Sequence, residues 1–289
     1  MMPALPAGYF ISKQMEEYVQ GKKIRNIESF DFIQPKYDSS DFFANFDKLI
    51  GSTILKANSN FMITDNGWLC EFGYGPGLLR YSETDAGFDK KVTKTNKTGF
   101  FKVRFSFNDG SYLHYAYSGW CSRFNIRQSE VLPKYPLEVF DDNDFTQEKM
   151  KLWLSDKSGW NVIETMALVK GATDIMMSHM NYIFWSCGIH PKTKVAALGE
   201  ADIYALYDAV KNYTDEYVFG KKTCNYIDIF GKSHAGNDAF FAFNKENCLG
   251  KLCQKCGTPY TAVGVGGTKA YICPKCQKIK KANLSKTVF

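Results

Sequence analysis

Residues 253–276 read CQKCGTPYTAVGVGGTKAYICPKC, a stretch that begins and ends with a Cys-x-x-Cys pair. Each pair forms a tight turn that lets two thiolates face the same metal ion. Two such pairs complete a tetrahedral site of four sulfur ligands, which suits zinc. Because four protein ligands leave no open position, we expect one structural Zn²⁺ ion. Its ligands are Cys253, Cys256, Cys273 and Cys276.

The segment between the two pairs, residues 260–272, contains Gly264, Gly266 and Gly267 and predicts a β-hairpin. The surrounding region is basic, because no Asp or Glu occurs between residues 251 and 281. A small ribbon with this one-sided charge can bind nucleic-acid phosphates, and the alternative is an ordinary solvated surface. The lysines of this region are Lys251, Lys255, Lys269, Lys275, Lys278, Lys280 and Lys281.

The composition of the whole chain sets wider limits. Its 289 residues suffice for one large domain or for a few small ones. The net charge is +6 and the pI is near 8.7, which is compatible with nucleic-acid binding but does not require it. Hydrophobic residues make up 45% of the chain, which is ample material for packed cores.

The remaining five cysteines are scattered along the chain, a pattern that favours a reducing compartment over a disulfide framework. The N-terminal residues show no basic segment followed by an apolar run, and no apolar stretch is long enough to span a bilayer. We therefore expect a cytoplasmic protein, associated with the nucleoid in a bacterium, with no membrane partner.

Residues 1–140 predict a domain made of one helix and antiparallel strands. The helix covers about residues 9–19, and we expect Phe10, Met15 and Val19 to share one of its faces. Residues 61–64 and 68–72 flank the turn signal Asn66-Gly67, and residues 101–107 alternate between polar and apolar before a turn at 108–110. These hairpins favour an antiparallel β-sandwich or barrel.

Residues 141–243 predict a helical domain. We expect helices at residues 146–154, within 161–169, after a cap at Asp174, and at 200–213. The inward residues of the last helix are expected to be Ile203, Leu206, Tyr207 and Val210. Gly188 is well suited to end the third helix, with Pro191 shortly after it. Residues 244–281 then form the zinc finger, and residues 282–289 form a tail. The predicted fold class is α+β.

Several segments resemble the formamidopyrimidine-DNA glycosylase and endonuclease VIII family. The finger carries Lys255-Cys256-Gly257-Thr258-Pro259 and Tyr271-Ile272-Cys273-Pro274-Lys275-Cys276-Gln277. Gly188-Ile189-His190-Pro191 resembles the helix end of that family's helix-two-turn-helix module. Weaker matches in the same order are Pro3-Ala4-Leu5-Pro6, Gly21-Lys22-Lys23-Ile24 and Asp228-Ile229-Phe230-Gly231.

The resemblance implies a function as well as a fold. Members of the family bind double-stranded DNA in a cleft between the β-sandwich and the helical domain, and they flip a damaged base out of the duplex. An N-terminal proline amine then attacks the sugar and forms a Schiff base, and β-elimination nicks the strand. The expected partner is therefore damaged or distorted duplex DNA, bound by a monomer.

Pro3 is the candidate nucleophile in this chain. It can supply a secondary amine if translation starts at Met2 and that methionine is removed, because a proline nitrogen inside a peptide bond cannot attack. The alternative is an ordinary proline in an N-terminal turn. Ala4 and Ala7 stand where the family has glutamates, and alanine cannot transfer a proton. Glu16 and Glu17 are the nearest carboxylates along the following helix.

The candidate phosphate contacts also depart from the family pattern. The family's strand lysine falls at Asn60, with Lys56 the nearest preceding cation, and its phosphate-binding Asn falls at Met177. The finger's arginine falls at Thr268, beside Lys269, which can neutralise a phosphate without the fork geometry of arginine. Side chains that could wedge into or stack on the DNA are Tyr74, Trp120 and Arg123, for which sandwich packing is the alternative.

Three hypotheses remain open at this level. The first is a bifunctional DNA glycosylase and AP lyase of the base-excision-repair type. The second is a catalytically degenerate relative that binds damaged, abasic or branched DNA without base excision. The third is a protein-interaction module that has kept only the fold.

Overall fold

The computed structural model describes residues 7–29, 45–72, 78–84, 101–116, 125–128, 145–167, 175, 177–219, 226–235 and 243–281. The chain divides into two compact units, each described by itself below. Unit 1 comprises Met1–Pro133 and Asn225–Gly236, and unit 2 comprises Lys134–Cys224 and Asn237–Phe289. No helix in the described ranges is both long and apolar enough to cross a membrane.

Unit 1 contains two four-stranded antiparallel sheets, which confirms the predicted β-sandwich. Residues from both sheets share one buried cluster, for example Met62 and Cys70 from one and Val103 and Phe105 from the other. The first sheet has the order β1 (Ile24–Ser29), β6 (Phe101–Phe107), β7 (Tyr112–Ala116), β5 (Leu78–Ser82). The second has the order β2 (Ile54–Ala57), β3 (Phe61–Thr64), β4 (Trp68–Glu71), β8 (Asn125–Gln128).

Both predicted hairpins are present in these sheets. Strands β3 and β4 pair around Asn66-Gly67, and strands β6 and β7 pair around residues 108–110. Gly67 and Gly110 have φ angles of 82° and 87°, the left-handed region that glycine enters without steric cost. The turn residues therefore fix the strand register that buries one face of each sheet.

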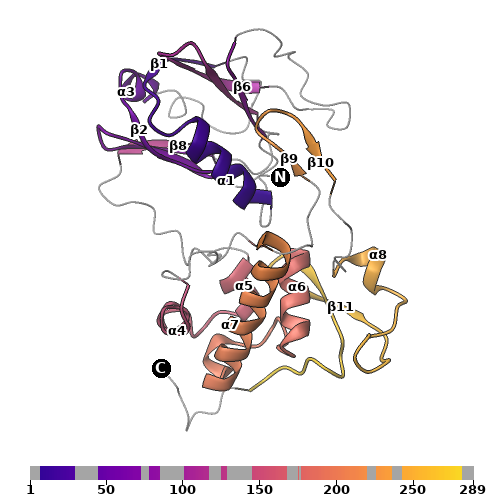
Figure 1. Cartoon of the computed structure of the whole chain (residues 1–289). Helices are drawn as coiled ribbons and strands as arrows, with labels where there is room; N and C mark the ends of the chain where they lie inside the picture. Colours follow the sequence, from indigo (N-terminus) through magenta and orange to yellow (C-terminus); the bar gives the residue numbers. More distant parts are fainter. Residues whose placement is uncertain are drawn as a thin grey trace. The chain divides into compact units, whose positions relative to one another are not determined.

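Helix α1 (Ala7–Tyr18) lies against β2 in unit 1 (Figure 1). Its buried stripe is Ile11, Met15 and, just beyond the helix, Val19, which recur every four residues and so share one face. The predicted stripe had included Phe10 in place of Ile11. The structure instead leaves Phe10 half-buried and stacked on Tyr226, with 5.2 Å between ring centroids. A short helix, α3 (Phe46–Leu49), buries Leu49 in the same core.

Residues 226–235 belong to unit 1 although they follow the helices of unit 2 in the chain. They form the two-stranded pair β9 (Tyr226–Ile227) and β10 (Ser233–His234). The buried Arg80 of β5 donates through Nη1 to the carbonyl oxygen of Asp228 at 2.9 Å, and Ile229 is fully buried. The sequence had placed this segment in the helical domain, because local periodicity cannot show that it returns to a distant sheet.

Unit 2 contains the predicted helices, now with defined ends. Thr146 caps the first, since its side chain accepts from the backbone N–H of Lys149. Gly188, with φ of 73°, lies just beyond the end of α6 as predicted. The helices are α4 (Gln147–Ser155), α5 (Val162–Ala167), α6 (Met177–Ser186) and α7 (Glu200–Thr214), followed by the π-helical turn η2 (Asp215–Phe219). Asp174, the predicted cap of α6, lies outside the described residues.

Helices α6 and α7 pack side by side in unit 2 (Figure 1). Ile203, Leu206 and Val210 of α7 are fully buried, as the sequence predicted. Tyr207 is only half-buried, because its ring stacks on Phe145 and its hydroxyl donates to the Phe145 carbonyl. The short segments η1 (Val195–Ala197) and α8 (Lys245–Cys248) complete the helical part, and β11 (Thr261–Val265) pairs with β12 (Thr268–Ile272).

Arg80 offers a test of how residues 226–235 are held in unit 1. Its Nη1 donates to the buried carbonyl oxygens of Leu79 and Asp228. Arg80→Met removes this donor and leaves both carbonyl oxygens without it. We expect the free energy of unfolding to fall by about 2 kcal/mol, measured by urea denaturation. The exposed Arg25 provides the matched control, and Arg25→Met is expected to change stability by less than about 0.5 kcal/mol. Equal urea midpoints for the two variants would contradict this role of Arg80.

Candidate metal centre and nucleic-acid interface

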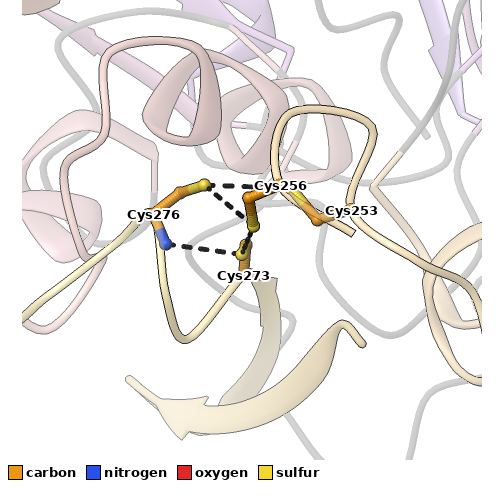
Figure 2. Close-up of side chains that lie close together, drawn as sticks. All are labelled: Cys253, Cys256, Cys273 and Cys276. Atoms are coloured by element: carbon orange, nitrogen blue, oxygen red, sulfur yellow. Dashed lines mark hydrogen bonds between the residues drawn. The ribbon is translucent and has the colours of Figure 1, made fainter. Parts of the chain in front are cut away.

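The four cysteines of the ribbon converge on one point, as Figure 2 shows. Their sulfur atoms all lie within 4.8 Å of one another. The measured pairs are Cys256–Cys273 at 3.4 Å, Cys256–Cys276 at 3.4 Å and Cys253–Cys276 at 3.9 Å. With Zn–S bonds of about 2.3 Å, neighbouring sulfurs of a tetrahedral site lie about 3.8 Å apart. The geometry therefore fits a single zinc ion held by the four predicted ligands.

The backbone of each turn favours thiolates at this point. The backbone N–H of Gly257 donates to the Cys253 carbonyl at 2.8 Å, and that of Gln277 donates to the Cys273 carbonyl at 2.9 Å. The backbone N–H of Cys276 points at the Cys273 sulfur, 3.4 Å away. Hydrogen bonds from Thr258 lower the pKa of Cys256 to about 6, which favours the form that binds metal. The ribbon is thus organised for a structural metal with no open position.

The first cysteine pair is attached to the C-terminal end of α6 through Trp185. The indole Nε1 of Trp185 donates to the Cys253 sulfur at 3.3 Å, and both side chains are buried. Lys255, between the two cysteines, donates through Nζ to the carbonyl oxygens of Trp185 and Ser186 at 3.3 and 2.8 Å. Its Nζ also lies 4.6 Å from the centre of the Trp185 ring. A cation at a helix C-terminus is stabilised by the helix dipole and by these last carbonyl groups.

The second cysteine pair is attached just beyond the same helix through Gln277. This side chain is almost fully buried, accepts from the backbone N–H of Cys273 and donates to the Ile189 carbonyl, both at 2.9 Å. Gly188 sits close to the Cys276 carbonyl oxygen, where an added Cβ would approach to 3.5 Å. The ribbon is therefore attached at the C-terminal end of α6 and at the Gly-Ile-His-Pro segment that follows it. The first cysteine pair bonds to Trp185, and the second is joined to Ile189 through Gln277.

Thr268 and Lys269 lie at the start of β12, next to the hairpin turn. Gly266 and Gly267 form that turn with φ angles of 56° and 75°. Thr268 is half-buried and pairs with Val265, whereas Lys269 is exposed and pairs with Gly264. Because Gly264 has no side chain, the neighbouring strand places no side chain opposite Lys269.

The seven lysines of the ribbon do not form one uniform basic surface. Lys255 is committed to α6, and Lys280 forms an ion pair with Asp202 of α7. The other five are exposed and form no ion pair within the described ranges; they are Lys251, Lys269, Lys275, Lys278 and Lys281. Five of the seven lysines of the ribbon therefore remain candidates for binding phosphates.

Lys56 and Asn60 lie near α1 in unit 1. Lys56 is exposed on β2, and Asn60 is half-buried in the turn between β2 and β3. The Asn58 side-chain oxygen accepts from the backbone N–H groups of Asn60 and Phe61, both at 2.8 Å, which fixes this turn. The backbone N–H of Ser59 donates to the Ser12 hydroxyl of α1 at 3.1 Å. The turn that carries Asn60 is thus tied to the helix that follows Pro3.

The remaining residues singled out from the sequence fall into two groups, those outside the described residues and those that the structure places. Pro3, Ala4, Tyr74, Trp120 and Arg123 lie outside the described residues. Met177, which stands at the family's phosphate-binding position, is the half-buried first residue of α6. Glu16 and Glu17 lie on the exposed face of α1, where Glu16 pairs with Lys13 at 2.9 Å. Neither glutamate points into the core of unit 1.

Three kinds of residue with structural contacts near the candidate sites or in unit 1 were not predicted from the sequence. Trp185 and Gln277 had a usable signal, since each lies within a few residues of a recognised motif. Arg80 of β5 had none, because a buried cation on a strand is indistinguishable from an outward-facing one by pattern alone. Asp228 and His234, whose side chains lie within hydrogen-bond distance at 2.8 Å, are six residues apart across a turn, a spacing that fits no regular element.

Trp185→Phe tests the link between α6 and the metal. The phenyl ring can keep the packing against Phe243 and the contact with Lys255, and only the N–H donor to Cys253 is lost. We expect zinc affinity, measured by competition with a chelator, to fall roughly 10- to 100-fold. In the Co²⁺-substituted protein the sulfur-to-cobalt charge-transfer band should move to longer wavelength, because a sulfur without this hydrogen bond gives up its electrons more easily. Trp160→Phe is the matched control, and identical behaviour of the two variants would contradict the link.

Comparison with known proteins agrees with this architecture. Residues 250–279 match the zinc finger found in FPG and IleRS. The chain is 23% identical to the formamidopyrimidine-DNA glycosylase of Ligilactobacillus salivarius and 26% identical to that of Mycoplasmopsis pulmonis. These alignments cover 96% of this chain and 100% and 99% of the two relatives, respectively.

Solved structures show the same fold. The Lactococcus lactis Fpg in a complex with DNA that contains an abasic site superposes with a TM-score of 0.65 at 18% identity. A MutM structure in complex with DNA that contains carbocyclic 8-oxo-G gives a TM-score of 0.66 at 18% identity. Both comparisons cover 96% of this chain and 100% of the other. The finger, the match along nearly the whole chain and the shared fold together make this chain similar to the formamidopyrimidine-DNA glycosylases.

Proposed function

We propose that this protein binds damaged duplex DNA and acts on it as a bifunctional DNA glycosylase and AP lyase of the base-excision-repair type. The observation that carries the proposal is the zinc ribbon, whose two cysteine pairs both bond to the end of α6 and whose hairpin presents Lys269 to solvent. The solved relatives with this fold include complexes with abasic-site DNA, which supports the same ligand here. The proposal includes a monomer in the cytoplasm, nucleoid-associated in a bacterium.

The DNA-binding part of the proposal rests on charge and on rigidity. Five exposed lysines on one small ribbon can replace the cations condensed on a duplex, whose release favours binding. Because side-chain hydrogen bonds from Trp185, Lys255 and Gln277 fix the ribbon to α6 and to the segment just after it, these charges keep a defined position relative to the helical domain. Phosphate contacts of this kind set the register of a protein on DNA.

The catalytic part of the proposal rests on Pro3. After removal of the preceding methionines its secondary amine is the nucleophile that attacks C1′ of the damaged nucleotide. Ala4, Asn60, Met177 and Thr268 depart from the family pattern together. These departures motivate the second candidate, a relative that binds damaged DNA without excising a base, which the next experiment separates from the first.

Reductive trapping decides between the two candidates. A preparation whose N-terminus is confirmed as proline by mass analysis is mixed with DNA that contains an abasic site and then with borohydride. We expect a covalent protein–DNA product, because borohydride reduces the Schiff base formed by a free amine. The matched control is the same chain with Met2 retained, in which the proline nitrogen is an amide and should give no product. If both preparations bind the DNA and neither is trapped, the protein is a non-catalytic binder.

Lys269→Gln tests the DNA-binding surface. Removal of one phosphate contact should weaken binding to abasic-site DNA about equally across sequences and reduce the salt slope of the affinity by about 1. Fluorescence anisotropy over a range of salt concentrations measures both quantities. Lys245→Gln, on the exposed face of α8, is the control and should leave the slope unchanged. If the two variants had equal salt slopes, Lys269 would not contact DNA phosphates.

A further inference from the structure

Two exposed leucines lie beside the first cysteine pair of the ribbon. Leu249 directly follows α8 and is 42% exposed, and Leu252 directly precedes the zinc ligand Cys253 and is 62% exposed. A single exposed leucine is ordinary on a protein surface, whereas neighbouring ones on a fixed backbone favour contact with another molecule. The backbone and the surroundings of this pair therefore decide what it can bind.

Hydrogen bonds fix the backbone around the two leucines. The backbone N–H of Lys251 donates to the Cys248 carbonyl at 3.0 Å, and that of Tyr260 donates to the Lys251 carbonyl at 3.1 Å. The backbone N–H of Cys253 donates to the Thr258 carbonyl at 2.8 Å. Because these bonds would have to break before the backbone could rotate the leucines inward, their exposure is a property of the fold.

The inward side of the same segment is already filled. Cys248, Cys253 and Tyr260 are buried in one cluster with Trp185 and Phe243. Interiors of this kind are close-packed, so they have no room for two further leucine side chains. The leucines can therefore be removed from water only by another molecule.

Both leucines flank the same short segment just before β11. Leu249 forms a parallel bridge with Tyr260, and Leu252 forms an antiparallel bridge with Pro259. Neighbouring strands lie about 5 Å apart, so the two leucines and the exposed Pro259 are close neighbours. We call Leu249, Leu252 and Pro259 the leucine surface.

The leucine surface lies at the end of the hairpin opposite Lys269. Lys269 is next to the turn that joins β11 to β12, whereas Pro259 comes before β11. The extended residues from Pro259 to Val265 span about 20 Å at a rise of about 3.3 Å per residue. A phosphate group bound at Lys269 therefore leaves the leucine surface uncovered.

The charges beside the leucine surface are mainly positive. Lys251 lies between the two leucines in the chain, and Lys245 accepts through its carbonyl from the backbone N–H of Leu249 at 3.1 Å. Both lysines are exposed and form no ion pair within the described ranges. Glu246 is the only Asp or Glu from residue 243 to residue 281. A ligand that complements this region combines negative charge with apolar groups.

Three kinds of occupant match this combination to different degrees. The backbone of a DNA duplex offers phosphates to the lysines but leaves the leucines uncovered. A second copy of this chain would bring the same lysines to the contact, and like charges that face each other oppose association. An acidic protein segment supplies carboxylates for the lysines and apolar side chains for the leucines.

We propose that the leucine surface is a docking site for an acidic segment of a partner protein. Two apolar side chains of that segment cover Leu249 and Leu252, and its carboxylates pair with Lys245 and Lys251. Because the site lies at the end of the hairpin away from Lys269, the partner and DNA bind at the same time. The docking site is independent of whether the protein excises a base.

Fluorescence anisotropy with a labelled acidic peptide, Asp-Asp-Leu-Asp-Leu-Asp-Asp, tests the docking site in the full-length zinc-loaded protein. Leu252→Ser should weaken peptide binding about 10-fold, as expected for loss of a central apolar contact. Leu55→Ser is the matched control, because Leu55 is 57% exposed on β2 in unit 1, and it should leave the affinity unchanged. Lys251→Gln should weaken binding and make it less sensitive to salt.

Two further measurements define the ligand. The same peptide with serine in place of both leucines should bind about 10-fold more weakly, because charge alone does not cover the leucine surface. Saturating peptide should leave the affinity for abasic-site DNA unchanged. The zinc content of each variant is measured in parallel, and Leu249→Ser serves as the second variant if Leu252→Ser loses zinc.

Several outcomes would overturn the proposal. These are a wild-type protein that does not bind the peptide, equal affinities of wild type and Leu252→Ser, and competition between peptide and DNA. Binding to phosphatidylglycerol vesicles that Leu252→Ser abolishes, without peptide binding, would assign the leucine surface to a membrane instead. Peptide binding is measured without DNA, so its failure is distinguishable from failure of the proposed repair function.

Discussion

Coordination of four thiolates by one metal ion is the constraint on which the C-terminal part of the molecule depends. Within residues 250–281 the buried apolar side chains outside the cysteines are few; they are Tyr260, Val265, Ala270 and Ile272. A segment of this size cannot bury enough apolar surface to stay folded by itself, and structural zinc supplies the missing free energy in such ribbons. The metal therefore determines whether the hairpin with Lys269 has a fixed shape.

The same coordination organises the end of α6. Trp185 bonds to one cysteine, Lys255 covers the last carbonyl groups of the helix, and Gln277 joins the second cysteine pair to Ile189. The metal site, the helix end and the Gly-Ile-His-Pro segment are consequently bonded to one another as one rigid part of unit 2. A DNA contact made by the ribbon therefore has a fixed position relative to the helices of unit 2, whereas Pro3, the proposed nucleophile, belongs to unit 1.

Those parts of the fold that follow from local chemistry were predictable from the sequence. The cause of each such feature lies within a few residues, and the structure confirms the cysteine pairs, the Asn66-Gly67 hairpin, the period-two strand at 101–107 and the helix that begins near Thr146. The return of residues 226–235 to unit 1 was not predictable, because it depends on Arg80, which lies 148 residues away in the chain. The exchange of Phe10 for Ile11 in the buried stripe of α1 has the same origin, since Tyr226 supplies the partner that draws Phe10 out of the stripe.

The candidate sites show the same division. The zinc ligands follow from spacing alone. The sequence also places Lys255 and Lys280 among the candidate phosphate-binding lysines, because it cannot show that their side chains bond to α6 and α7. The sequence singled out Asp228-Ile229-Phe230-Gly231 but could not predict its contacts, because Gln14 of α1, which accepts from the backbone N–H of Ile229, is distant in the chain. The candidate sites thus combine motifs that can be predicted locally with contacts that only the folded chain creates.

The central claim is that the zinc-loaded protein recognises damaged DNA. The most direct test compares its affinity for a duplex that contains a tetrahydrofuran abasic-site analogue with its affinity for the same duplex undamaged, at one fixed salt concentration. The account predicts clearly tighter binding to the abasic duplex, because only a damaged site adds contacts beyond the phosphate charge shared by both duplexes. Equal affinities for the two duplexes would contradict it.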